Sequence, residues 1–197
     1  MISDKDIITF QLPPWVVQLS QKNSQEFKEA NTPSHLRHRD ERGDTVIEDN
    51  MTGNLIHYAF CRHFFGQEGV GKYLDAYWVS NKFPEIRDRR GTQHVSDMGY
   101  DVLRLNIDFK GSFLRTTLPM IKHRAPVRPY EMHRGHVYCF GLISADDKKW
   151  YAHLLGWAKG TSFPDEPLSD ESSVFNGAYI LPASELNAFI PWKWEMF

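Results

Sequence analysis

The chain has 197 residues, which fits one domain of ordinary size and is long enough to bury most of its apolar surface. Hydrophobic residues make up 41% and charged residues 24%, a composition that excludes a disordered chain. The formal net charge is −2, so the total charge gives no indication of a polyanionic partner.

The N-terminal sequence and the cysteine count indicate the compartment. No stretch is apolar over the roughly 18 residues that a membrane span requires, and MISDKDIITF has neither a basic leader nor an apolar signal region. Two cysteines, Cys61 and Cys139, are too few for a disulfide framework. We therefore expect a soluble, cytoplasmic protein with no membrane partner, in which both thiols are buried and free.

The first 50 residues predict one helix followed by a charged loop. The run VVQLSQKNSQEFKEA, residues 16–30, is rich in helix-forming residues, and Pro13 and Pro14 precede it, where proline can open a helix. NTPSHLRHRDERGD, residues 31–44, is polar and is broken by Pro33 and Gly43, which predicts a loop. We expect residues 1–50 and a core of residues 51–197 to form one single domain, 1–197.

The core begins with a second predicted helix. In NLIHYAFCRHFFG, residues 54–66, Leu55, Ile56 and Phe60 contribute to one broad apolar face, and Gly66 provides the stop. VLRLNIDFK, residues 102–110, alternates apolar and polar residues as a strand with one buried face does.

Further strands follow this segment. Residues 136–144 and 150–160 are apolar strand-like runs joined by the turn-rich ADDKK, which predicts a hairpin. GAYILPASELNAFI predicts a short strand, a break at Pro182 and a helical turn from Ser184. This order predicts an α/β fold with a mixed central β-sheet flanked by helices.

An acid-x-lysine triplet on the strand at 102–110 stands out from three others in the chain. Glu26 and Lys28 lie on a predicted helix, where residues two apart point to nearly opposite sides, and the triplets within residues 146–149 lie in a predicted turn. Asp108 and Lys110 project from the same face of a strand, about 6.6 Å apart. That spacing suits one shared ligand.

A second aspartate precedes the triplet on the same segment. If the chain bends after Asp101, its carboxylate can converge with that of Asp108 on one divalent ion, with the carbonyl of Phe109 as a further ligand. Mg²⁺ prefers a few carboxylates with water and phosphate oxygens, and Lys110 beside it could orient a water or stabilise negative charge. The pattern therefore suits phosphodiester hydrolysis.

The stretch GYDVLRLNIDFKGS resembles the signature of the PD-(D/E)XK nuclease superfamily, with Asp101 and then Asp108-Phe109-Lys110. The preceding helix, the later hairpin containing Gly156-Trp157 and the closing YILPASEL are also similar, so the likeness spans roughly residues 50–190. The resemblance implies a restriction-endonuclease-like fold and a Mg²⁺- or Mn²⁺-dependent endonuclease, a hydrolase that acts on phosphodiester bonds of nucleic acid, most directly DNA.

Two positions depart from the family pattern. Tyr100 stands where the signature has proline. Many members carry a metal-binding glutamate on the preceding helix, and this helix has none, so Glu48 just upstream or the carbonyl oxygen of Asn54 would have to serve.

The region after the triplet is basic. Six lysines or arginines lie between residues 110 and 136 against one acid, Glu131, which predicts contacts with a phosphate backbone or, alternatively, a solvated loop. The candidate nucleic-acid-binding residues are Ser112, Arg115, Lys122, Arg124, Arg128, His133, Arg134 and His136.

Two other interpretations fit the same residues. One is a catalytically inactive nucleic-acid-binding module of the same fold, and the other is a structural or partner-binding domain in which Asp108 and Lys110 form a surface pair. Zinc is disfavoured because no cysteine pair exists. Cutting both strands of a duplex would favour a homodimer.

Overall fold

A computed structural model describes residues 2–30, 48, 50–64, 66, 107–170, 173 and 175–189. The first predicted helix is confirmed as α1 (Pro14–Ala30), which begins at Pro14 because proline is tolerated in a first helical turn. The second is confirmed as well, since residues 50–64 are helical, whereas the predicted loop at 31–44 lies outside the described residues. Among the described helices, none is long and apolar enough to cross a membrane.

The helices cover a mixed four-stranded sheet, as the α/β prediction requires. Its strand order is β1 (Ile8–Gln11), β5 (Lys149–Lys159), β4 (Val137–Asp146) and β2 (Ile107–Phe113). β1 and β4 both run antiparallel to β5, and β2 runs parallel to β4. The predicted hairpin is therefore β4–β5, and Asp147 and Lys148 close its turn with positive φ angles of 41° and 69°.

The parallel pairing of β2 with β4 dictates the path of the chain between them. Parallel neighbours need a crossover, because the end of one strand lies far from the start of the next. The crossover occupies residues 114–136 and contains η4 (Met120–Lys122), β3 (Arg124–Val127) and η5 (Pro129–Glu131). The expectation of a solvated loop here is wrong for β3, which pairs antiparallel with β6 (Tyr179–Pro182) in a second sheet.

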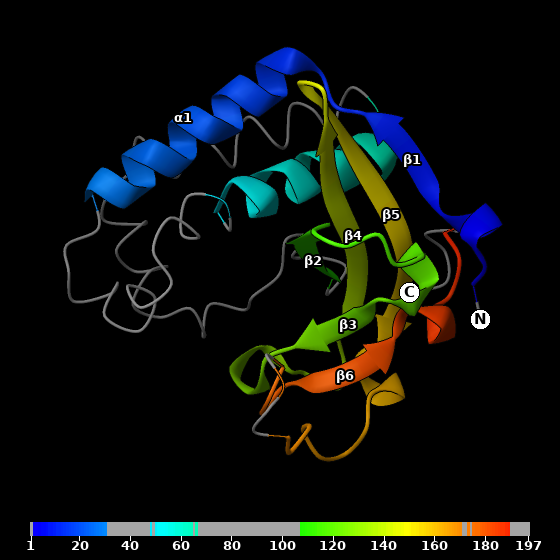
Figure 1. Cartoon of the computed structure of the whole chain (residues 1–197). Coiled ribbons are helices and arrows are strands. Elements are labelled where there is room, and N and C mark those ends of the chain that lie inside the picture. Colours follow the sequence, from blue (N-terminus) through cyan, green and yellow to red (C-terminus); the bar gives the residue numbers. More distant parts are fainter. Residues whose placement is uncertain are drawn as a thin grey trace.

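The two faces of the four-stranded sheet carry two different cores. On one face, Phe109, Cys139 and Ile143 pack with Val16 of α1 and with the helix at 50–64. On the other face, Tyr138 and other β4 residues pack with β3, β6 and η7 (Ala183–Glu185). In Figure 1 the two helices lie above and the β3–β6 pair below.

Several sequence predictions are extended or confirmed by this arrangement. β2 continues three residues past Lys110, to Phe113, and the predicted strand residues 102–106 lie outside the described part. The expected break at Pro182 is confirmed, since β6 ends there and η7 follows. Cys61 and Cys139 are buried and free, also as expected. β1 was not predicted, because four residues are too few to show a clear alternation.

Candidate functional site

The predicted pair Asp108 and Lys110 lies on β2, the edge strand of the sheet as far as the chain is described, on the face that the crossover covers. Strand alternation directs Phe109 to the opposite face, where its ring stacks on Phe60 with centroids 4.7 Å apart. Asp108 is paired in register with Tyr138 of β4, which lies on the same face. The two charged side chains are therefore held where the helices do not cover them.

Lys110 lies between two carboxylates. Its Nζ is 2.8 Å from Oδ2 of Asp108 and 3.3 Å from Oε2 of Glu131. The Asp108 side chain is 9% exposed, that of Lys110 20% and that of Glu131 29%, so the cluster is partly shielded and still reachable from solvent. We refer to Asp108, Lys110 and Glu131 as the charged cluster.

Tyr138 fixes the segment that supplies Glu131. Its hydroxyl donates a 2.7 Å hydrogen bond to the backbone carbonyl of Glu131 and accepts one of 2.7 Å from the backbone N–H of His133. Burial of the ring raises the pKa of Tyr138 to about 12, with the negative charges of Asp108 and Glu131 adding to the shift. The hydroxyl therefore stays protonated and able to donate.

Two histidines adjoin the charged cluster. The rings of His133 and His136 stack with centroids 4.3 Å apart, and His136 is buried. Desolvation, together with the smaller effects of His133 and Lys110, lowers the pKa of His136 to about 4. At neutral pH the His136 ring is uncharged.

The other predicted metal ligands lie apart from this cluster or beyond the described chain. Asp101 is outside the described residues. Glu48 forms an ion pair with Arg115, which joins the start of the second helix to the segment after β2. Asn54 is half-buried on that helix, which packs on the sheet face opposite Asp108. The predicted roles of Glu48, Asn54 and Asp101 in metal binding stay predictions.

The predicted nucleic-acid-binding residues have varied surroundings. Arg134 donates to the carbonyls of Gly160, Phe163 and Pro164 at 2.8–3.1 Å, so its guanidinium holds the segment after β5. Arg124 lies over the Phe175 ring, and Arg128 donates to the Tyr130 hydroxyl at 2.7 Å. Ser112, Lys122, Arg124 and Arg128 are exposed. Their contact with nucleic acid stays a prediction.

Sequence reasoning missed Glu131 and Tyr138 as members of the site. Glu131 had a visible signal, because it is the one acid between Lys110 and His136. An isolated acid in a basic stretch is a candidate partner for a buried or catalytic cation. No sequence feature indicated a role for Tyr138 in the site, since the apolar run that contains it predicts only a core strand.

Within the described residues, no group of three or more histidine, cysteine or acidic side chains has the spacing of a metal site. Comparison of the chain with protein-family models, with well-characterised proteins and with solved structures gives no significant match in any of the three. The interpretation of the site therefore depends on its geometry.

Tyr138→Phe tests how the Glu131 segment is positioned. The change keeps the buried ring and removes both hydrogen bonds of the hydroxyl, so we expect the free energy of unfolding to fall by about 1–3 kcal/mol in urea denaturation. The matched control is Tyr151→Phe on neighbouring β5. The hydroxyl of Tyr151 makes no such bond in the described chain, so this change should leave the free energy of unfolding nearly unchanged. Equal losses in the two variants would contradict the role of Tyr138.

The lowered pKa of His136 predicts a pH-dependent stability. The unfolded chain takes up a proton on this ring below pH 6.5, whereas the folded chain resists until about pH 4. The free energy of unfolding should therefore fall by about 2 kcal/mol more in the wild type than in His136→Gln between pH 7 and pH 4.5. Urea denaturation at both pH values measures this difference, and parallel pH profiles would rule it out.

Proposed function

We propose that this chain is a metal-dependent nuclease that hydrolyses phosphodiester bonds in DNA. The observation that carries the proposal is the charged cluster, in which the lysine of the acid-x-lysine triplet contacts its own aspartate and a second carboxylate. A lysine beside carboxylates at a partly exposed sheet edge is the arrangement that positions a water and a scissile phosphate near a divalent cation.

The charges of the cluster favour a cation as its ligand. Two carboxylates and one ammonium leave one net negative charge, and a neutral His136 adds none. A phosphate group alone would be repelled by that balance, whereas Mg²⁺ or Mn²⁺ would reverse it and let the phosphate approach. Carboxylate oxygens are also the ligands that these ions prefer.

Asp108 and Asp101 are the proposed metal ligands, with Lys110 as the catalytic cation. When bound, the ion would polarise the phosphoryl oxygen and lower the pKa of a water. Lys110 would stabilise the negative charge that develops on the phosphate, and Glu131 would keep its ammonium in place. The exposed residues Lys122, Arg124 and Arg128 would contact the phosphate backbone, and a homodimer would cut both strands.

The proposal includes a restriction-endonuclease-like fold and a cytoplasmic setting. The fold is supported by the mixed sheet, with an acid-x-lysine triplet on an edge strand and a preceding helix on one face. The setting is supported by two buried cysteines that remain free, since disulfides are rare in reducing compartments.

The test is cleavage of duplex and single-stranded DNA with Mg²⁺ or Mn²⁺, using the wild type, Asp108→Asn and Lys110→Met. Both variants should lose about a hundredfold or more in rate while circular dichroism shows a retained fold. The matched controls are Asp146→Ala and Lys149→Ala, which change acid and lysine residues of the exposed β4–β5 turn and should cleave like the wild type.

The outcomes separate the three interpretations. Cleavage that survives Asp108→Asn and Lys110→Met would contradict the proposed site. Salt-sensitive DNA binding without cleavage under any divalent ion would support the inactive binding module instead. If the wild type neither binds nor cleaves DNA, the charged cluster is a structural feature of the domain.

A further inference from the structure

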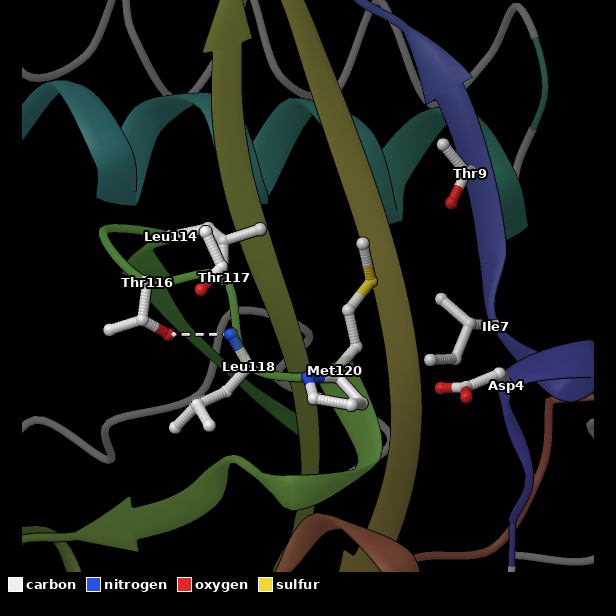
Figure 2. Close-up of a pocket in the computed structure, with 9 residues that line it drawn as sticks. Asp4, Ile7, Thr9, Leu114, Thr116, Thr117, Leu118 and Met120 are labelled. Carbon is white, nitrogen blue, oxygen red and sulfur yellow. Dashed lines mark hydrogen bonds between the residues drawn. The ribbon is translucent and has the colours of Figure 1, made fainter.

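A cleft separate from the charged cluster opens at the other end of the crossover. It encloses about 420 Å³ between η1 (Asp4–Asp6) with β1 on one side and the first part of the crossover on the other (Figure 2). That volume lies within the range of small-molecule sites. Asp4, Ile7 and Thr9 line one side, and six residues of the stretch 114–120 line the other.

The inner wall of the cleft is apolar and fixed. Ile7, Leu114 and Met120 are half-buried and pack against the core that lies on this face of the sheet. At the rim, the backbone N–H of Leu118 donates to the hydroxyl of Thr116 at 3.4 Å, drawn as a dashed line in Figure 2. The apolar part of a ligand would therefore displace water from side chains that are already held in place by the core.

Thr9 supplies a held hydroxyl on the β1 side of the cleft. Its Oγ1 is 2.9 Å from Nδ1 of His153, and Nε2 of the same ring is 2.7 Å from Oγ of Ser144. Burial lowers the pKa of His153, so the neutral ring donates through one nitrogen and accepts through the other. The hydroxyl of Thr9 keeps further hydrogen-bonding capacity toward the cleft, where Figure 2 places it.

Among the described residues, Asp4 is the one charged side chain that lines the cleft. The neighbouring Asp6 carboxylate accepts from the backbone N–H and the hydroxyl of Ser3, which lowers its pKa and fixes η1. Asp4 has no such partner among the described residues. Because the described lining holds no lysine or arginine, the cleft is complementary to a cation and unsuited to a phosphate.

We infer that this cleft binds a small organic ammonium ion with a compact apolar body. The ammonium group pairs with Asp4, the apolar body contacts Ile7, Leu114 and Met120, and Thr9 accepts or donates a hydrogen bond at the far end. The inference does not depend on the proposed nuclease activity, because it involves none of the charged-cluster residues.

The experiment is an NMR titration of the full chain, labelled with ¹⁵N, with three matched probes. These are 2-phenylethylammonium, the neutral 2-phenylethanol and the anionic 2-phenylacetate. We expect shifts of the backbone amides of residues 4–9 and of the non-proline residues of 114–120, with millimolar affinity for the ammonium ion, about fivefold weaker binding of the alcohol and none of the acetate.

Variants then assign the interaction to its residues. Asp4→Asn should weaken binding of the ammonium probe about fivefold and leave the alcohol unaffected, whereas the exposed control Asp146→Asn should change neither. Leu118→Ala, at a residue that lines the cleft and is 54% exposed, should weaken both probes without disturbing the fold. Equal affinity for ammonium ion and alcohol, no effect of Asp4→Asn, or no shifts at about 10 mM probe would each overturn the inference.

Discussion

The parallel pairing of β2 with β4 is the constraint on which the rest of the structure depends. Ile107 at the start of β2 is paired with Val137 at the start of β4, so the chain must return from Phe113 along the full length of the pair, about 20 Å. The return passes over the sheet face that the helices leave uncovered, because the opposite face is filled by α1 and the helix at 50–64. The charged cluster and the cleft both lie along this return path.

The end of the crossover brings Glu131 to Lys110, and Tyr138, in register with Asp108, bonds to the backbone on either side of Met132. The charged cluster is thus assembled from β2 and from the end of the crossover, which Tyr138 anchors to β4. The start of the crossover forms the cleft with η1 and β1. The charged cluster places a lysine between two carboxylates, whereas the cleft presents the single carboxylate of Asp4, from η1, beside apolar side chains, so the two regions suit different ligands.

The local sequence pattern predicted the features that depend only on neighbouring residues in the chain. Alternation in LNIDFK correctly placed Asp108 and Lys110 on one face of a strand, and the two apolar runs around ADDKK correctly predicted a hairpin. Glu131 could not be placed, because its approach to Lys110 follows from which strands are neighbours and in which direction they run. The segment RAPV is too short, with a proline inside it, to predict β3. The charge of Arg134 gave no sign that its guanidinium donates to carbonyl oxygens of the protein itself.

The charged cluster is proposed as the binding site of a divalent cation, and calorimetric titration with Mn²⁺ tests this proposal most directly. The account predicts that the wild type and Asp146→Ala bind Mn²⁺ with the same affinity and that Asp108→Ala loses the binding heat while remaining folded. Binding that is absent from the wild type, or that persists unchanged in Asp108→Ala, would contradict it.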